Sequence, residues 1–147
     1  MNERTHRFTK GLYLLVITAL LAGLALAVAP VAQAATFDIA DGDVAGLIAA
    51  INTANGNGQP DTINLAAGGT YTLTTEDNDE PLGDGPNGLP PVTSQITING
   101  NGATIQRNPS FDCPVDDGSS DFRIFHVTDS GALTLNDLTV SNGCPYT

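Results

Sequence analysis

Carboxylates dominate the side chains that could do chemistry, and they gather in two polar segments rich in proline and glycine, 76–94 and 108–121. Oxygen clusters of this kind suit a hard cation such as calcium. The spacing does not follow an EF-hand, because Pro81 stands where the third ligand would lie. We therefore expect solvated acidic loops and no cofactor, with calcium as the weaker alternative. The carboxylates concerned are Glu76, Asp77, Asp79, Glu80, Asp84, Asp112, Asp116, Asp117 and Asp121.

An enzyme would have to draw its acid, base or charge stabiliser from these aspartates and from Arg107, Arg123 and His126. Arg123 and His126 lie three residues apart in an expected strand, so their side chains would point to opposite faces. We expect His126 to be an isolated wall residue and Arg123 to pair with a nearby aspartate at the surface. The sequence therefore predicts no catalytic residue.

The chain has two cysteines, Cys113 and Cys144, and each precedes a proline in loop-like sequence. A disulfide between them fits an oxidising compartment and would contribute roughly 3 to 4 kcal/mol by closing a loop of this size. Two free thiols, or pairing between chains, fit the same count. The sequence alone leaves these alternatives open.

The first 34 residues have the layout of a secretory signal peptide. Arg4, Arg7 and Lys10 form a basic start, and the uncharged run 11–29 follows. Pro30 breaks the run, and 32–34 reads Ala-Gln-Ala, which predicts cleavage before Ala35. An uncleaved membrane anchor is the alternative. We expect a protein that is secreted or held at the cell surface, with no membrane contact after cleavage.

Removal of the signal peptide leaves 113 residues with two arginines, no lysine and 15 acidic residues, a net charge of −13. Such a chain repels phosphate backbones and anionic lipids, which excludes nucleic acid as an expected partner. The chain has no tryptophan and few other aromatic residues, so a core must be built from Ile, Leu, Val and Ala. Stacked strands can bury such residues in a chain of this length.

One amphipathic helix is predicted over 43–54, because Val44, Leu47, Ile48 and Ile51 recur at helical spacing after the N-cap Asp43. The turn residues of 55–60 end it. Short alternating segments follow and predict strands. They are 62–65, 70–73, 95–98, 103–106, 122–127, 132–135 and 138–140.

Tight turns join several of these strands, and omission of the two long loops leaves a weak repeat of strand, turn and strand. This predicts an all-β chain: a right-handed parallel β-helix, or β-solenoid, with an N-terminal capping helix. Inward Ile, Leu and Val would alternate with outward Thr and Asn, and turn asparagines would stack into ladders, with Asn99, Asn101, Asn136 and Asn142 as candidates. The expected organisation is a signal peptide at 1–34, an N-terminal cap at 35–60, and the first two to three coils at 61–147.

The segments 43–55, 61–65 and 69–73, continued by 96–100 and 122–143, resemble the CSLREA-domain proteins of bacteria. These are right-handed β-helix surface proteins similar to polymorphic outer membrane proteins and to the pectate lyase-like architecture. In place of the family's Cys-Ser-Leu-Arg-Glu-Ala helix start, this chain has Val-Ala-Gly-Leu-Ile-Ala at 44–49. The resemblance implies a surface protein and assigns no catalytic residue.

The chain ends at Thr147 directly after an expected strand. We expect it to be the front piece of a longer protein, because solenoids require more repeats and a closing cap; a complete chain would have to protect that edge by dimerising. The predicted function is a non-catalytic structural or adhesive module that contacts extracellular carbohydrate or a surface protein. The alternatives are the non-catalytic beginning of a polysaccharide-degrading lyase or hydrolase, and the inert product of a decayed gene.

Overall fold

The computed structural model describes residues 32–80, 85–113 and 121–144, all within the unit Ala32–Thr147. The predicted signal peptide, apart from its last three residues, lies outside the described residues. The described elements are β1 (Thr36–Ile39), α2 (Val44–Asn57), β2 (Asp61–Leu65), β3 (Thr70–Leu73), β4 (Asn78–Glu80), β5 (Gly85–Asn87), β6 (Gln95–Arg107) and β7 (Ala132–Ser141). No helix in this part of the chain is long and apolar enough to cross a membrane.

Helix α2 forms for the reasons that the sequence indicates. The Asp43 side chain accepts a hydrogen bond from the Gly46 amide at 2.8 Å, which caps the first turn. Gly58 ends the helix in the left-handed conformation, with φ of 67°. The helix begins one residue later and ends three residues later than the predicted 43–54. Its buried face is formed by Leu47, Ala50, Ile51 and Ala54.

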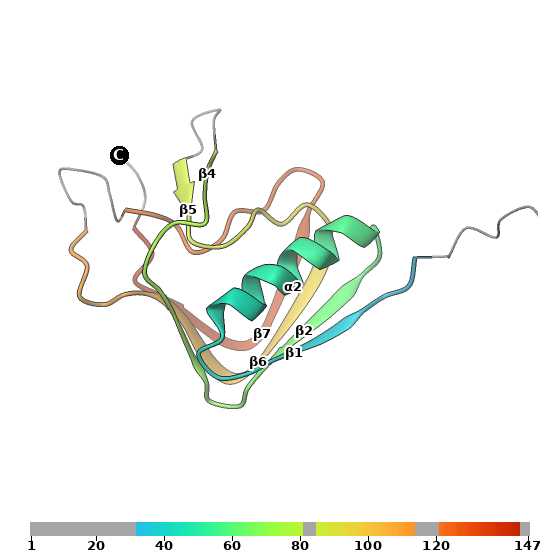
Figure 1. The fold of residues 1–147 in the computed structure, drawn as a ribbon, viewed down its shortest axis with the longest axis horizontal. Coiled ribbons are helices and arrows are strands. Elements are labelled where there is room, and N and C mark those ends of the chain that lie inside the picture. Colours follow the sequence, from blue (N-terminus) through green and yellow to red (C-terminus); the bar gives the residue numbers. More distant parts are fainter. Residues whose placement is uncertain (1–31, 81–84, 114–120, 145–147) are drawn as a thin grey trace, which may run out of the picture. The chain divides into compact units, whose positions relative to one another are not determined.

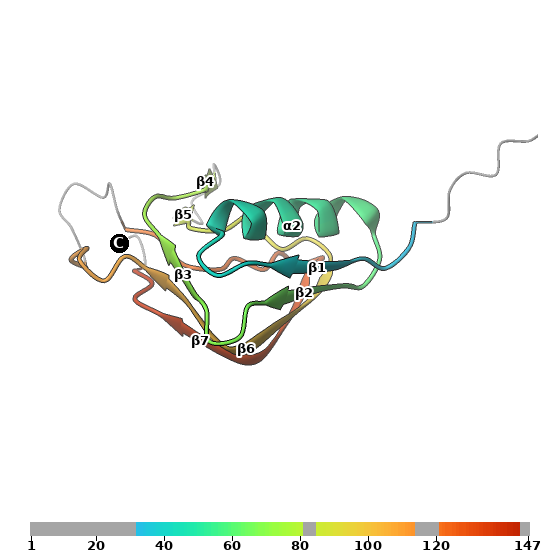
Figure 2. The same ribbon diagram turned by 60° about the horizontal axis from the view of Figure 1, so that its bottom comes forward.

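One parallel sheet of five strands organises the domain, in the order β1-β2-β6-β3, with β7 along the other side of β6. The first half of β6 pairs with β2 and its second half with β3, while β7 follows β6 through both halves. The sheet is curled, and α2 lies across its concave side beside β1 (Figures 1 and 2). A separate antiparallel hairpin joins β4 to β5.

The curl arises where β6 and β7 bend together. The register shifts between Asn99 and Ala103, and Asn101 and Asp137 take positive φ angles of 51° and 47°. Gly100 is needed at this bend, because a Cβ atom there would lie 2.7 Å from the Leu138 Cβ. Two long bent strands therefore replace what the sequence suggested were four short ones.

The core lies between α2 and the inner side of the sheet. Alternate apolar residues of β2 and β6 face it, as the burial pattern of β2 shows, and the inward and outward alternation predicted from the sequence is confirmed. Tyr71 is fully buried and uses its hydroxyl to donate to the Ile39 carbonyl and to accept from the Ala66 amide, both at 3.0 Å. On β7, Leu135 and Val140 remain about 40% exposed.

The predicted fold class, a right-handed parallel β-helix with a capping helix, is wrong for this structure. The described residues form a small domain of strands and one short helix around a curled, half-barrel parallel sheet, and no long solenoid is present. The strand pairs predicted at 95–98 and 103–106, and at 132–135 and 138–140, are single bent strands rather than separate walls of a coil. The strand predicted at 122–127 contributes only isolated bridges, at Arg123 and Val127.

Candidate functional site

Four side chains on the outer face of the sheet form one continuous row, which we call the polar ladder: Asp38, Asn64, Asn99 and Asn136. Each occupies the same register position on its strand. Asn64 donates to the Asp38 carboxylate at 2.8 Å, Asn99 donates to Asn64 at 3.0 Å, and Asn136 donates to Asn99 at 3.0 Å. Every amide in the row points the same way, so one hydrogen-bonded chain crosses β1, β2, β6 and β7.

A second row runs beside the first and consists of threonines, the threonine row: Thr36, Thr62, Thr97 and Thr134. Each threonine precedes its ladder residue by two positions, and residues two apart in a strand lie on the same face. All four are exposed or half-buried. Neighbouring rungs are separated by the strand spacing of about 4.8 Å. The outer face thus repeats one hydroxyl and one carboxamide group per strand, with Asp38 as the only charge in the two rows.

The same regularity continues past the bend. Thr70, Thr104 and Thr139 are in register across β3, β6 and β7. Gln106 lies two residues further along β6 and donates to the Thr72 hydroxyl at 3.2 Å. Hydroxyl and carboxamide groups therefore occupy the outer side of the sheet both before and after the bend in β6 and β7.

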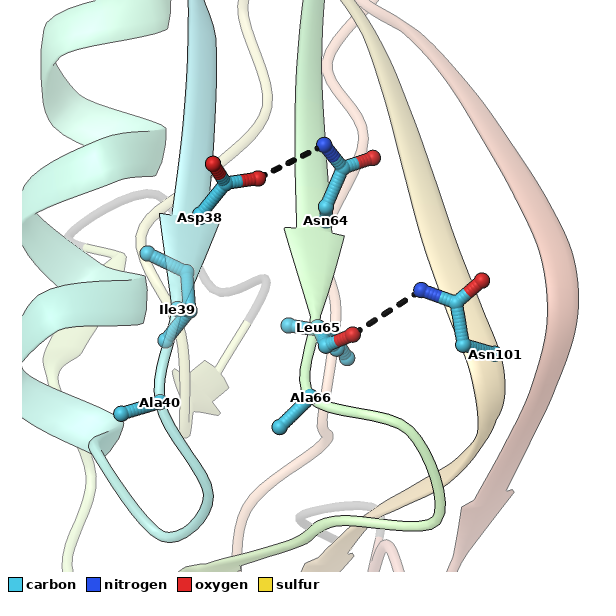
Figure 3. A pocket seen from close by; sticks show the side chains of 7 residues that line it. All are labelled: Asp38, Ile39, Ala40, Asn64, Leu65, Ala66 and Asn101. Carbon is cyan, nitrogen blue, oxygen red and sulfur yellow. Dashed lines mark hydrogen bonds between the residues drawn. The ribbon is translucent and has the colours of Figure 1, made fainter.

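A shallow hollow of about 550 Å³ opens where β1 and β2 end, next to the polar ladder (Figure 3). Its polar groups come from Asp38, Asn64 and Asn101, and Asn101 donates to the Leu65 carbonyl at 3.0 Å. Its apolar lining is Ile39, Ala40, Leu65 and Ala66. The hollow offers acceptors and donors at the start of the ladder, on a face that is accessible to a large ligand.

Arg107, one of the basic residues considered for catalysis, is held inside the domain by several contacts. Arg107 is 2% exposed, and its guanidinium donates to the carbonyls of Asn142, Phe111 and Asp112 at 2.8 to 3.2 Å. The guanidinium also lies 5.7 Å from the Phe111 ring centre, within cation–π range. Backbone carbonyls and an aromatic ring inside the domain thus contribute to holding its positive charge.

Within the described residues, Arg123 does not pair with a surface aspartate as the sequence suggested. Arg123 donates to the Asn87 side chain and the Gly85 carbonyl, both at 3.2 Å, and neither acceptor is an aspartate. Arg123 and His126 do not lie on a regular strand, so the argument from opposite faces does not apply. His126 is half-buried, and its carbonyl accepts from the Val92 amide at 2.8 Å.

The acidic loops are only partly described. Glu76 and Asp77 are exposed, and Asp77 accepts from the Asn78 side chain at 3.1 Å. Asp84, Asp116 and Asp117 lie outside the described residues. Within the described ranges, one group of metal-type donors comes together: Asp121 with Cys113 and Cys144, whose ligand atoms lie within 4.8 Å of one another. This group does not suit a metal, because both sulfurs are consumed by a disulfide and metal binding requires thiolates.

The Cys113–Cys144 disulfide, one of the alternatives left open by the sequence, is formed. The two Cα atoms are 5.8 Å apart, and the bond spans 31 residues. It ties the end of the chain after β7 to the loop after β6. Such bonds are typical of oxidising compartments.

Sequence reasoning found part of the polar ladder and missed the rest. Asn99 and Asn136 were expected in a ladder and lie in one. Asn101 instead donates its side-chain amide to the Leu65 carbonyl, and the backbone carbonyl of Asn142 accepts from Arg107. Asp38 and Asn64 were missed. The pattern that could have identified them is Thr, apolar, Asp or Asn, which recurs at 36–38, 62–64, 97–99 and 134–136.

No protein-family model, no curated protein and no solved structure matches this chain.

Proposed function

We propose that the mature chain is an exported, non-catalytic adhesion module that binds an uncharged polysaccharide on the outer face of its sheet. One observation carries the proposal: the polar ladder and the threonine row repeat the same two groups in register on successive strands. The strand spacing of about 4.8 Å is close to the length of one sugar ring in an extended chain. A polysaccharide lying across the strands would thus meet one hydroxyl and one carboxamide per sugar.

The chemistry of these groups suits hydroxyl-rich ligands. A threonine hydroxyl both donates and accepts hydrogen bonds, and a carboxamide donates through its nitrogen and accepts through its oxygen. Each rung can therefore bind a sugar hydroxyl that acts as a donor or as an acceptor. The rungs are fixed before a ligand arrives, because each asparagine is already bonded to its neighbour. Little side-chain ordering would then oppose binding.

Charge favours a neutral ligand. The chain after residue 34 carries a net charge of −13, which would repel acidic polysaccharides. The disulfide supports export, since such bonds are typical of oxidising compartments. The internal use of Arg107 by backbone carbonyls supports a non-catalytic role.

The test uses the oxidised chain recovered from an exporting host and suspensions of cellulose, chitin and an acidic pectate gel. We expect depletion of the protein by at least one neutral polymer and none by pectate. The variant T62V/T97V removes two central hydroxyls while keeping the β-branched shape. It should weaken binding roughly tenfold, because each lost hydrogen bond contributes about 1 kcal/mol or less to the binding free energy.

The matched control is T53A, which changes an exposed threonine on α2, away from the outer face of the sheet. It should bind like the unmodified chain. Binding that T62V/T97V leaves unchanged, or the absence of binding to every neutral polymer, would contradict the proposal.

A further inference from the structure

Asp61, at the start of β2, is a buried carboxylate with an incomplete set of partners. Its side chain is 2% exposed. One oxygen, Oδ1, accepts from the Ala35 backbone nitrogen at 2.5 Å and from the Asn57 side chain at 3.0 Å. The other oxygen, Oδ2, is buried and has no hydrogen-bond partner among the described residues. A buried carboxylate oxygen without a donor is unfavourable, which suggests that a donor is still to be supplied.

The residue that touches Asp61 is the one at which the mature chain is predicted to begin. Ala35 is held on both sides, because its nitrogen bonds to Asp61 and its carbonyl accepts from the Thr62 amide at 3.0 Å. The three residues before it, Ala32 to Ala34, are exposed. The Ala34–Ala35 bond therefore joins an accessible segment to a nitrogen that is already seated on a buried carboxylate.

We propose that Asp61 is the binding site for the α-ammonium group that proteolytic processing creates at Ala35. Hydrolysis adds one water to the Ala34–Ala35 peptide bond. The carboxylate product leaves on Ala34, and the Ala35 nitrogen becomes an ammonium group carrying three protons. An amide at that position offers one N–H, whereas the ammonium offers three and a positive charge. It can keep its bond to Oδ1 and supply the missing donor to Oδ2.

Such a pair has the features of a strong buried interaction. The carboxylate is buried and Ala35 is half-buried, the geometry is set by the fold rather than by long flexible side chains, and Asn57 satisfies the second lone pair of Oδ1. The inference depends on export and cleavage but not on polysaccharide binding, so either proposal can fail without the other.

Amine chemistry tests this directly, because the chain from Ala35 onward contains no lysine. Its α-amino group is then the only primary amine. The full chain is expressed with its leader in an exporting host, and mass spectrometry of the recovered protein should show Ala35 as the first residue. The native protein and its urea-unfolded form are then treated with an amine-acylating succinimidyl ester at neutral pH. We expect labelling of the native α-amine to be at least tenfold slower.

Substitution of the carboxylate should abolish that protection. D61N should raise the native labelling rate to within about threefold of the unfolded rate, while D38N, which alters an exposed carboxylate of the polar ladder, should leave it unchanged. Because D61N could fail to fold, a second variant keeps Asp61 and inserts Gly-Ser between Ala34 and Ala35. Its displaced amine should label rapidly, and its melting temperature should fall by roughly 10 °C.

Two results would overturn the proposal. One is a native α-amine at Ala35 that labels as fast as the unfolded chain. The other is a mature chain that begins at a different residue and is as stable as a chain engineered to begin at Ala35.

Discussion

Replacement of Asn99 by alanine tests whether the polar ladder stabilises the sheet. Asn99 is an inner rung, donating to Asn64 and accepting from Asn136, both at 3.0 Å. Two hydrogen bonds contribute about 1 to 3 kcal/mol in total. Because Asn99 is half-buried, water replaces part of what is lost. We therefore expect the free energy of unfolding to fall by about 1 to 1.5 kcal/mol, a value at the lower end of that range. Asparagine and alanine are both poor strand formers, so propensity contributes little to the difference.

The matched control is Asn136→Ala at the exposed end of the ladder, which removes the single hydrogen bond that Asn136 donates to Asn99. It should lower the free energy of unfolding by only about 0.5 kcal/mol. Urea unfolding followed by circular dichroism measures both, and N99A should lower the midpoint by roughly 0.5 to 1 M. The double variant N64A/N99A should lose less unfolding free energy than the sum of the two single variants, because both remove the same hydrogen bond between Asn99 and Asn64. The difference should equal about the contribution of that one hydrogen bond. An N99A effect equal to or smaller than that of N136A would refute the reasoning.

Three further predictions concern the disulfide, a buried phenol and the bend. C113S/C144S should lose about 3 to 4 kcal/mol of unfolding free energy, because the bond closes a loop of 31 residues; reduction of the unmodified chain should give the same urea midpoint within error. Burial raises the pKa of Tyr71, with nearby Asp41 and Asp43 adding to the effect and the bond from the Ala66 amide opposing it. The fold therefore favours the neutral phenol, and the contribution of Tyr71 to stability should be constant below about pH 10 and fall above it. A series of urea midpoints above about pH 10 should show a smaller fall in Y71F than in the unmodified chain. G100A should destabilise the protein by about 1 to 3 kcal/mol, since its Cβ would meet Leu138. The control is G56A in α2, where a Cβ meets nothing within 4 Å, and it should be neutral or stabilising by about 0.5 kcal/mol. Thermal melts compare the two variants.

The helix and the alternation of the strands were predictable because both depend on local pattern. Asp43, the apolar spacing that follows it and the glycine after the last turn fix α2 through backbone capping and one buried face. The period of two in 61–65 and 95–98 likewise decides which side chains face inward. These choices need no knowledge of distant residues.

The fold class was not predictable by the same means. Asn99-Gly100-Asn101-Gly102 has the composition of a tight turn that ends a strand, but in the structure it is a bend inside β6. Pairing with β7, which bends at Asp137, keeps both strands continuous through this point. Whether glycine and asparagine end a strand or bend it depends on the neighbouring strand, which local composition does not contain.

The candidate site was partly visible for a related reason. The motif of Thr, apolar, Asp or Asn occurs in four strands, but it becomes a site only when parallel pairing sets all four in register. Asp61 was not identified at all. Its burial depends on contact with Ala35 and Asn57, which lie outside its own strand.

The disulfide also bears on when the chain can become fully folded. Cys144 follows β7, the last described strand, so its bond to Cys113 closes only after every described strand of the domain has reached an oxidising compartment. Inside a reducing cytosol the same chain lacks about 3 to 4 kcal/mol of stabilisation, a large part of the 5 to 15 kcal/mol that holds a typical domain together. For an exported protein, this keeps the precursor easy to unravel for passage through a narrow translocation channel. Once the thiols pair on the far side, the domain resists unravelling, and backward movement through the channel is disfavoured.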